Sequence, residues 1–133
     1  MIDDIPRLPI AWLADVDGTV ALSPHRNPYD WRRAADDLPN MAVITAVQAM
    51  AAHPGIDVML VITGREEQSR NLTEQWLRNH GIPFDELLMR TDGDYRPDDV
   101  IKEELYRQLK RPGSVGGSSY WISTRVWSVR CAS

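Results

Sequence analysis

The chain alternates short apolar runs with longer amphipathic segments. The apolar runs have the length of strands, and the amphipathic segments repeat their apolar positions at helical spacing. Strands are predicted at 10–16, 56–62 and 84–89, and helices at 41–52, 66–80 and 98–109. Because strand and helix alternate, the pattern predicts an α/β fold, an open doubly wound parallel sheet. Ligands bind such sheets at the carboxyl ends of the strands.

The motif Asp15-Val16-Asp17-Gly18-Thr19 directly follows the first apolar run. Two carboxylates at this spacing on a strand point the same way and repel each other unless a metal ion or a proton intervenes. Gly18 and Thr19 predict a tight turn with free N–H groups and a hydroxyl, which suits an anion. A nucleophilic carboxylate, an acid/base, a cation and a phosphate cradle could share this loop. The alternative is a solvated turn.

A second motif, Thr63-Gly64-Arg65, is predicted where the second strand ends and a helix begins. The amino end of a helix favours anions. Thr63 could donate its hydroxyl to a phosphoryl oxygen, and Arg65 could bind a substrate phosphate. The alternative for Thr63 is an ordinary helix cap.

Lys102 lies four residues after Asp98 in the third predicted helix, so the two side chains share one helical face. Such a pair is usually a surface feature. A lysine that instead reaches a carboxylate-rich site would balance the charge of a nucleophile and bind a transferring phosphoryl group.

The connection from Val20 to Leu38 is long for a compact domain. It carries a set of cationic and aromatic residues, namely Arg26, Tyr29, Trp31, Arg32 and Arg33. A connection of this kind beside a site is either a substrate collar or an ordinary surface loop.

Composition predicts a soluble cytoplasmic protein of one domain that does not contact a membrane. The chain has 133 residues with 43% hydrophobic content, an acidic start and no apolar run long enough to span a bilayer. Cys131 is the single cysteine, and His25, His53 and His80 are isolated in the sequence. Residues 1–104 carry a net charge of −9, whereas 105–133 carry five basic residues and no acidic ones. A basic tail of this kind can bind nucleic acid.

The order of these motifs resembles the haloacid dehalogenase superfamily of phosphotransferases. Two longer segments are more specific: 26–31 (Arg-Asn-Pro-Tyr-Asp-Trp) and 90–104, which runs from Arg90 to Glu104, are similar to the 3′-phosphatase domain of phage-type polynucleotide kinase–phosphatases. The resemblance covers residues 9 to about 110. It implies a phosphatase with a minimal cap that acts on 3′-phosphorylated nucleic-acid ends, with a separate kinase or ligase as a possible partner.

The resemblance also implies roles for individual residues. Asp15 would be the nucleophile, Asp17 the general acid and base, and Mg²⁺ would bind the Asp15 carboxylate and the Asp17 main-chain carbonyl. Thr63 and Lys102 would hold the phosphoryl oxygens. The substrate-binding set would be Gly18, Thr19, Arg26, Gly64, Arg65, Arg90 and Asp98, in which three arginines form a basic collar and Asp98 orients Lys102.

The end of the chain departs from this family. The resemblance requires a fourth strand that ends in an aspartate, but no residue after Glu104 is acidic. In the adjacent reading frame the codons of Tyr120-Trp121-Ile122 must encode Leu-Asp. We therefore divide the chain into a phosphatase core, 1–110, and a tail, 111–133, that is either divergent or an out-of-frame translation.

Three functions follow from the sequence. The first is a Mg²⁺-dependent phosphatase that removes the 3′-phosphate of nucleic-acid ends through an aspartyl-phosphate, impaired by the loss of the last carboxylate. The second is a phosphatase of small nucleotides. The third is a catalytically inactive module that binds nucleic-acid ends. No Walker-type glycine-rich loop is present in the sequence, so no kinase half is predicted.

Overall fold

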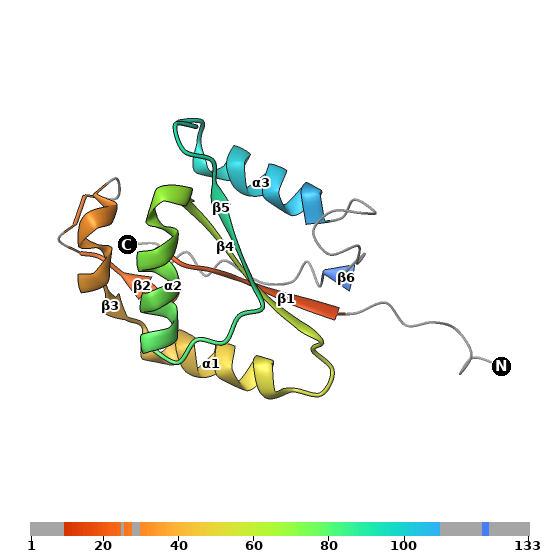
Figure 1. Cartoon of the computed structure of the whole chain (residues 1–133). Helices are drawn as coiled ribbons and strands as arrows, with labels where there is room; N and C mark the ends of the chain where they lie inside the picture. The colour runs from red at the N-terminus through yellow and green to blue at the C-terminus, as the bar shows by residue number, and fades with distance from the viewer. Residues whose placement is uncertain (1–9, 25, 28–29, 110–120, 123–133) are drawn as a thin grey trace.

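The fold is a parallel sheet with helices on both faces, seen in a computed structural model that describes residues 10–24, 26–27, 30–109 and 121–122 (Figure 1). The sheet has the order β5-β4-β1-β6, and all its pairings are parallel. Its strands are β1 (Ile10–Asp15), β4 (Val58–Glu66), β5 (Glu86–Arg90) and β6 (Trp121–Ile122). The helices are α1 (Met41–Ala52), α2 (Arg70–Asn79) and α3 (Asp98–Leu109). The predicted doubly wound α/β fold is confirmed.

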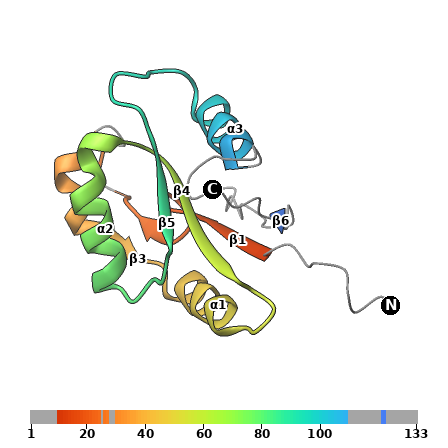
Figure 2. The ribbon, with the colours of Figure 1, turned by 45° about the vertical axis from the view of Figure 1, so that its right-hand side comes forward.

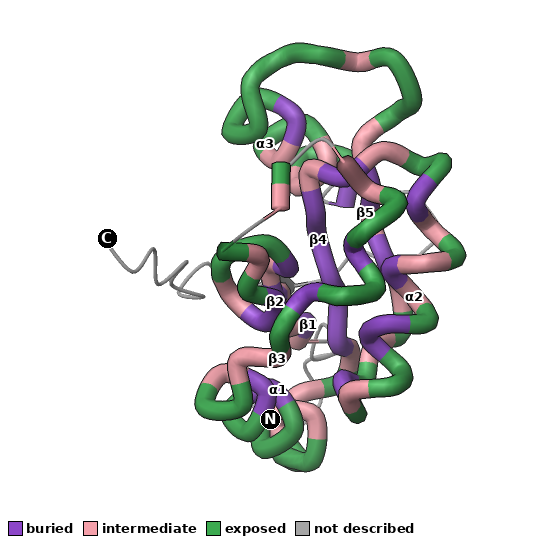
Figure 3. Tube along the Cα trace, turned by 90° about the vertical axis from the view of Figure 1, so that its left-hand side faces the viewer, coloured by how far each residue is buried: buried purple, intermediate pink, exposed green. Residues whose placement is uncertain are grey.

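Helices α1 and α2 cover one face of the sheet, and α3 covers the other (Figures 1 and 2). The larger core lies under α1 and α2, where Ile44 and Leu77 are fully buried against strand residues such as Val61. The smaller core lies under α3, where Leu109 packs on Leu60. Burial is nearly continuous along β4, as expected for a central strand of a parallel sheet covered on both faces (Figure 3).

The predicted elements are present, but the second strand is longer than the sequence indicated. β4 runs through Thr63-Gly64-Arg65 to Glu66, so this motif lies inside the strand and not at the start of a helix. A short 3₁₀ helix, Glu67–Ser69, follows, and α2 begins only at Arg70. The extension is stabilised by pairing of Glu66 with Arg90 of β5, across a register shift after Ile62. Thr63 is therefore not a helix cap.

The connection between β1 and α1 forms a small cap over the carboxyl end of the sheet. It consists of the two-stranded hairpin β2 (Ala21–Leu22) and β3 (Leu38–Pro39) around a 3₁₀ helix, Trp31–Asp36. Trp76 of α2 fixes the cap to the core, because its indole Nε1 donates a hydrogen bond of 3.0 Å to the main-chain oxygen of Asp37. Tyr29 and His25 lie outside the described residues.

Strand β6 pairs with β1 at the position where a fourth strand was expected. The rest of the tail, 111–120 and 123–133, lies outside the described residues. The out-of-frame origin of the tail stays a prediction. None of the described helices has the length and apolar character needed to cross a membrane.

Candidate active site

Asp15 ends β1 and faces helix α3. Alternate residues of a strand point to opposite faces of the sheet, and Ala11 and Leu13 belong to the core cluster under α3. The Asp15 carboxylate therefore lies on the same face, where the Nζ of Lys102 is 3.0 Å from its Oδ1. The hydroxyl of Thr19 lies 3.4 Å from the other oxygen and donates a long hydrogen bond to it.

Lys102 bridges two carboxylates. Its Nζ is 2.7 Å from Oδ2 of Asp98, one helical turn earlier, so the predicted i,i+4 pair is present and points into the site. Gly64 of β4 makes room for Asp98, because a Cβ at position 64 would lie 1.7 Å from the Asp98 Oδ1. The guanidinium of Arg90 lies 3.7 Å from the same oxygen. Glycine at position 64 therefore allows the α3 carboxylate to lie in this position against β4.

Burial and charge act in opposite directions on this pair. Desolvation by burial raises the pKa of Asp15 above its ordinary value, although the charge of Lys102 favours the ionised carboxylate. Burial alone would lower the pKa of Lys102, but the charges of Asp15 and Asp98 outweigh it and raise that pKa. Lys102 therefore stays protonated and supplies the nearest positive charge to the Asp15 carboxylate.

Asp17 lies on the other side of the strand end and is held by Arg65. The Arg65 side chain leaves β4 toward α2, where the residue is only 7% exposed. Its Nη2 lies 2.7 Å from Asp17 Oδ1, and its Nε lies 3.0 Å from Oδ2. A further donor, Nη1, hydrogen bonds the hydroxyl of Thr73 in α2. This bidentate geometry fixes the orientation of the Asp17 carboxylate.

Asp37 is a site residue that the sequence did not indicate. Its carboxylate is almost fully buried and accepts hydrogen bonds from Nε and Nη2 of Arg26, at 2.8 and 2.9 Å, and from Nη2 of Arg65, at 2.8 Å. The bonds to Asp37 also raise the pKa of Arg26. Locally, nothing distinguishes Asp37 from the exposed Asp36. Because buried cations require buried anions, a buried position of the two arginines would indicate that an acidic side chain lies beside them, but the sequence does not show which one.

The expected basic collar stays a prediction, and the structure gives its three arginines partners inside the protein. Arg26 and Arg65 are paired with Asp17 and Asp37 and are not directed to solvent. Arg90 donates to main-chain oxygens of its neighbourhood, including Gly64 at 2.7 Å. For Arg26 and Arg65 the physical reason is that acidic side chains of the cap and of the turn after β1 neutralise them.

The turn after β1 also differs from expectation. The N–H groups of Gly18 and Thr19 donate to main-chain oxygens of the same turn, at 2.8 and 3.2 Å, so the predicted free N–H groups are absent at these two residues. Gly18 has φ +76, which explains the glycine. Thr63 is completely buried, and its hydroxyl accepts the N–H of Arg65 at 3.2 Å.

The Asp15 carboxylate retains capacity for a cation. Its Oδ1 is buried 3.0 Å from the Lys102 Nζ, and a carboxylate oxygen has a second lone pair that can face a cation. The described residues contain no group of three acidic, histidine or cysteine side chains that could hold a metal ion. One carboxylate and a main-chain carbonyl fit Mg²⁺, which usually keeps several of its waters and binds substrate phosphate.

This arrangement defines the class of protein. A parallel sheet whose first strand ends in Asp-x-Asp, with a lysine from a later helix against the first aspartate, is that of a haloacid dehalogenase-type phosphatase domain. Residues 9–112 match the family described as the polynucleotide kinase PNKP phosphatase domain, and the chain belongs to this family.

The similar proteins are larger than this chain. A protein of Autographa californica nuclear polyhedrosis virus, named as a bifunctional polynucleotide kinase/RNA ligase, is 34% identical over 108 residues, which cover 79% of this chain and 15% of the relative. Two solved structures of Pnkp1/Rnl/Hen1 complexes, one titled an RNA repair complex, match with TM-scores of 0.76 and 0.75 and 34% identity. Each covers 87% of this chain, but only 35% and 38% of the matched chains.

Proposed function

We propose that this chain is a Mg²⁺-dependent phosphatase that removes the 3′-phosphate from nucleic-acid ends through an aspartyl-phosphate. The observation that carries the proposal is the Asp15 carboxylate, which is buried with its Oδ1 3.0 Å from the Lys102 Nζ and keeps a lone pair that the lysine does not occupy. A carboxylate in this state can attack a phosphorus atom, because it has an available lone pair and an adjacent fixed positive charge.

The first step transfers the phosphoryl group to Asp15. An Asp15 oxygen forms a bond to phosphorus while the bond from phosphorus to the 3′-oxygen breaks. Lys102, positioned by Asp98, offsets the negative charge of the phosphoryl oxygens. Asp17 donates a proton to the leaving 3′-oxygen. Its side chain is 41% exposed, so substrate can reach it while Arg65 holds it from the inside.

The second step hydrolyses the aspartyl-phosphate. Asp17, now ionised, takes a proton from water as the water oxygen attacks phosphorus and the bond to Asp15 breaks, which restores both carboxyl groups to their initial states. Ionised Asp17 is stabilised by the bidentate contact with Arg65. When bound to the Asp15 carboxylate and the Asp17 carbonyl, Mg²⁺ would supply additional neutralisation of phosphoryl charge.

The substrate class and partners are inferred from the relatives. Their names join a polynucleotide kinase to an RNA ligase, and place a Pnkp1 chain in an RNA repair complex with Rnl. A 3′-phosphatase fits such a setting, because a ligase joins ends that carry a free 3′-hydroxyl. We infer that a separate kinase or ligase acts on the same ends as this chain.

The test is phosphate release from a 3′-phosphorylated oligonucleotide with and without Mg²⁺, using the full chain and Asp15→Asn. The proposal expects turnover that requires Mg²⁺, is lost in Asp15→Asn and is strongly reduced in Asp17→Asn, since Asp17 acts in both steps. Asp57→Asn, at the opposite end of the sheet beside Ile10, is the matched control. A 3′-mononucleotide turned over as fast as the oligonucleotide would instead favour a small-nucleotide phosphatase.

A second candidate is a module that binds nucleic-acid ends without turnover. It is favoured by one observation: in the described ranges no third carboxylate joins Asp15 and Asp17 in a metal-binding group. Tight binding of a 3′-phosphorylated oligonucleotide by a folded chain that releases no phosphate at any Mg²⁺ concentration would establish this candidate and reject the phosphatase.

A further inference from the structure

The connection between β5 and α3, residues 91–97, presents one exposed aromatic ring. Tyr95 is 81% exposed, the highest value among the large hydrophobic residues that the structure describes. Single exposed apolar side chains are normal on protein surfaces, so the exposure alone assigns no role to this ring. The connection that carries it, however, lies at the carboxyl end of the sheet, where the site is.

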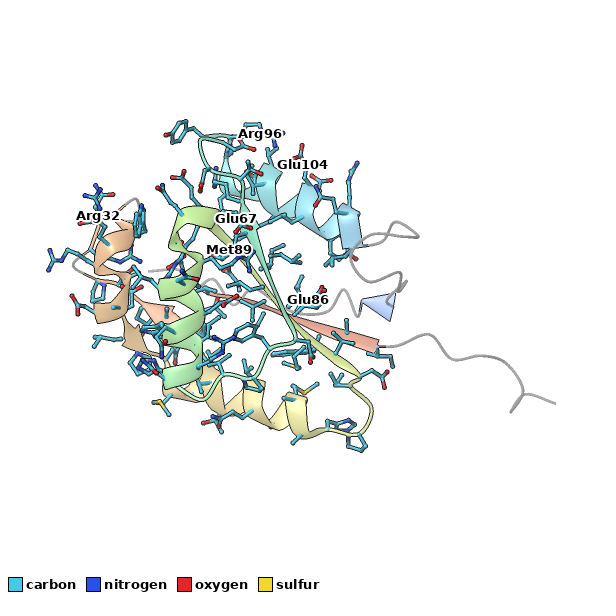
Figure 4. All side chains as sticks on the ribbon, in the orientation of Figure 1. Arg32, Glu67, Glu86, Met89, Arg96 and Glu104 are labelled. Atoms are coloured by element: carbon cyan, nitrogen blue, oxygen red, sulfur yellow. The ribbon has the colours of Figure 1, made fainter. Side chains whose placement is uncertain are left out.

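The connection is fixed in place by side chains despite its exposure. Arg96 binds Asp94 on one side, at 2.8 Å, and Glu104 of α3 on the other, at 2.6 Å (Figure 4). These contacts lower the pKa of Asp94 to about 2 and also lower that of Glu104. Exposed ion pairs contribute little to stability one by one, but here they restrict the conformation of the residues on either side of Tyr95.

Two more contacts attach the connection to the end of β4 and to the 3₁₀ helix that follows it. A carboxylate oxygen of Asp92 accepts the N–H of Gln68 at 2.8 Å. Glu66, the last residue of β4, accepts the N–H of Gly93 at 3.0 Å. Gly93 has φ +78, a conformation in which other residues are strained. The backbone that presents Tyr95 is therefore built as a defined turn.

Arg90 couples this turn to the site. Its Nη1 donates to the main-chain oxygens of Asp94 and Arg96, the two neighbours of Tyr95, at 2.8 and 2.6 Å. Its Nε donates to the oxygen of Gly64 at 2.7 Å, beside the carboxylate that holds Lys102. One guanidinium thus connects both neighbours of Tyr95 to the wall of the phosphoryl site.

The surface around Tyr95 is acidic, which limits how it can hold a nucleic acid. Its carboxylates are those of Glu66, Glu67, Asp92, Asp94, Asp98 and Glu104, and the cations among them are Arg70, Arg90, Arg96 and Lys102. Each of these cations already binds a carboxylate. Phosphates of a strand would gain little attraction here. A nucleobase, in contrast, can stack on an aromatic ring without any charge contact.

We infer that Tyr95 is a substrate-binding residue whose ring stacks on a nucleobase next to the 3′-phosphate of a single-stranded end. This inference rests on the proposed function and names the part of the substrate that the chain recognises apart from its phosphate. It explains why an exposed aromatic side chain is carried on a turn fixed to Gly64 and α3. It also separates polynucleotide ends from small phosphate esters, which have no base to stack.

The test compares KM and kcat for three substrates in the full chain: a 3′-phosphorylated oligonucleotide, the same oligonucleotide with its two terminal bases absent, and p-nitrophenyl phosphate. Tyr95→Ala is expected to raise KM for the intact oligonucleotide about 5- to 100-fold, since one base–aromatic stack contributes that much to binding. The abasic oligonucleotide should lose this difference between the two proteins. Tyr95→Trp should restore the KM, and Met41→Ala, at another exposed apolar position, is the control.

Three outcomes would overturn the inference. The first is an equal KM change for intact and abasic oligonucleotides, and the second is a parallel loss with p-nitrophenyl phosphate. The third is no change with any substrate. If the chain shows no turnover, quenching of fluorescence in Tyr95→Trp beyond that of the original protein, which has five tryptophans of its own, by the intact but not the abasic oligonucleotide would support stacking while rejecting the phosphatase. Absence of that quenching would reject stacking.

Discussion

Arg65 and Asp17 form a bidentate ion pair between the ends of two neighbouring strands. Both donors of Arg65 that face the carboxylate are within 3.0 Å of an oxygen, and the arginine side chain is 5% exposed while that of Asp17 is 41% exposed. A buried cation thus holds the inner side of a carboxylate whose outer side faces the site. In the proposed mechanism, Asp17 would exchange protons with substrate and water from the orientation that Arg65 sets.

Arg65→Lys tests this orientation. Lysine keeps the charge but cannot form two parallel bonds to a carboxylate. We expect kcat to fall about 10- to 100-fold with a smaller change in KM, because a positioned general acid or base contributes at least this much to the rate of the chemical step. The measurement is steady-state turnover of a 3′-phosphorylated oligonucleotide, with Arg78→Lys on the exposed face of α2 as the control. An unchanged kcat would show that Arg65 does not orient Asp17.

Asp37→Asn tests the buried charge cluster. Asparagine preserves the volume but removes the buried one of the two anions that Arg26 and Arg65 share, and leaves only the half-exposed Asp17. Loss of one partner of a buried pair costs up to about 3–5 kcal/mol, and because Asp17 remains we expect part of this, a fall in melting temperature of about 5 °C or more. Calorimetry checks this, and Asp36→Asn at the exposed neighbouring position should change the melting temperature little. Equal melting temperatures for the two variants would contradict a structural role for Asp37.

The sequence predicted the pair Asp98–Lys102, and offered a lysine that reaches the first aspartate as the alternative to a surface pair, because much of this geometry is local. The alternation of β1 decides which face Asp15 occupies, and the i,i+4 spacing decides that Asp98 and Lys102 share a side of α3. The placement of α3 over that face of the sheet is not determined locally. It follows from the parallel order of the strands. The core elements were predictable for the same reason.

The arginine cluster was not predictable because its anion comes from a distant part of the chain. Asp37 is 28 residues from Arg65 and 11 from Arg26, in a connection without regular periodicity. A sequence shows that Arg65 follows an apolar strand, but not that a cap residue neutralises it. The length of β4 was missed for a related reason, since pairing with Arg90 extends it beyond the apolar run.

Gly64→Ala tests the close approach of β4 and α3. The new methyl group would meet Asp98 Oδ1 at 1.7 Å, so the carboxylate must move and Lys102 would lose the partner 2.7 Å from its Nζ. We expect at least a tenfold loss of kcat, because transition-state charge stabilisation by one group is of this size or larger. The melting temperature should change little, because Asp98 is half exposed and can rotate away.

The matched control for Gly64→Ala is Gly55→Ala, in the turn that leads into the opposite end of β4. There the added Cβ would meet only atoms of the flexible His53 side chain, at 3.0 Å. Turnover by this variant should equal that of the original protein. If Gly64→Ala retains full activity, Asp98 is not needed to hold Lys102.

The pair Asp94–Arg96 predicts how the turn around Tyr95 responds to acid. Arg96 holds the pKa of Asp94 at about 2, below its ordinary value, so the pair favours the folded turn above about pH 4 and this contribution is lost as the pH falls through about 2. Carboxyl chemical shifts measured from pH 5 to pH 2.5 should show Asp94 still ionised at pH 3. Because the side chains are exposed, added salt should weaken the effect.

In the control variant Arg96→Gln, Asp94 should instead titrate near its ordinary value of about 4. Titration near 4 in both proteins would mean that Arg96 does not restrain the turn that presents Tyr95.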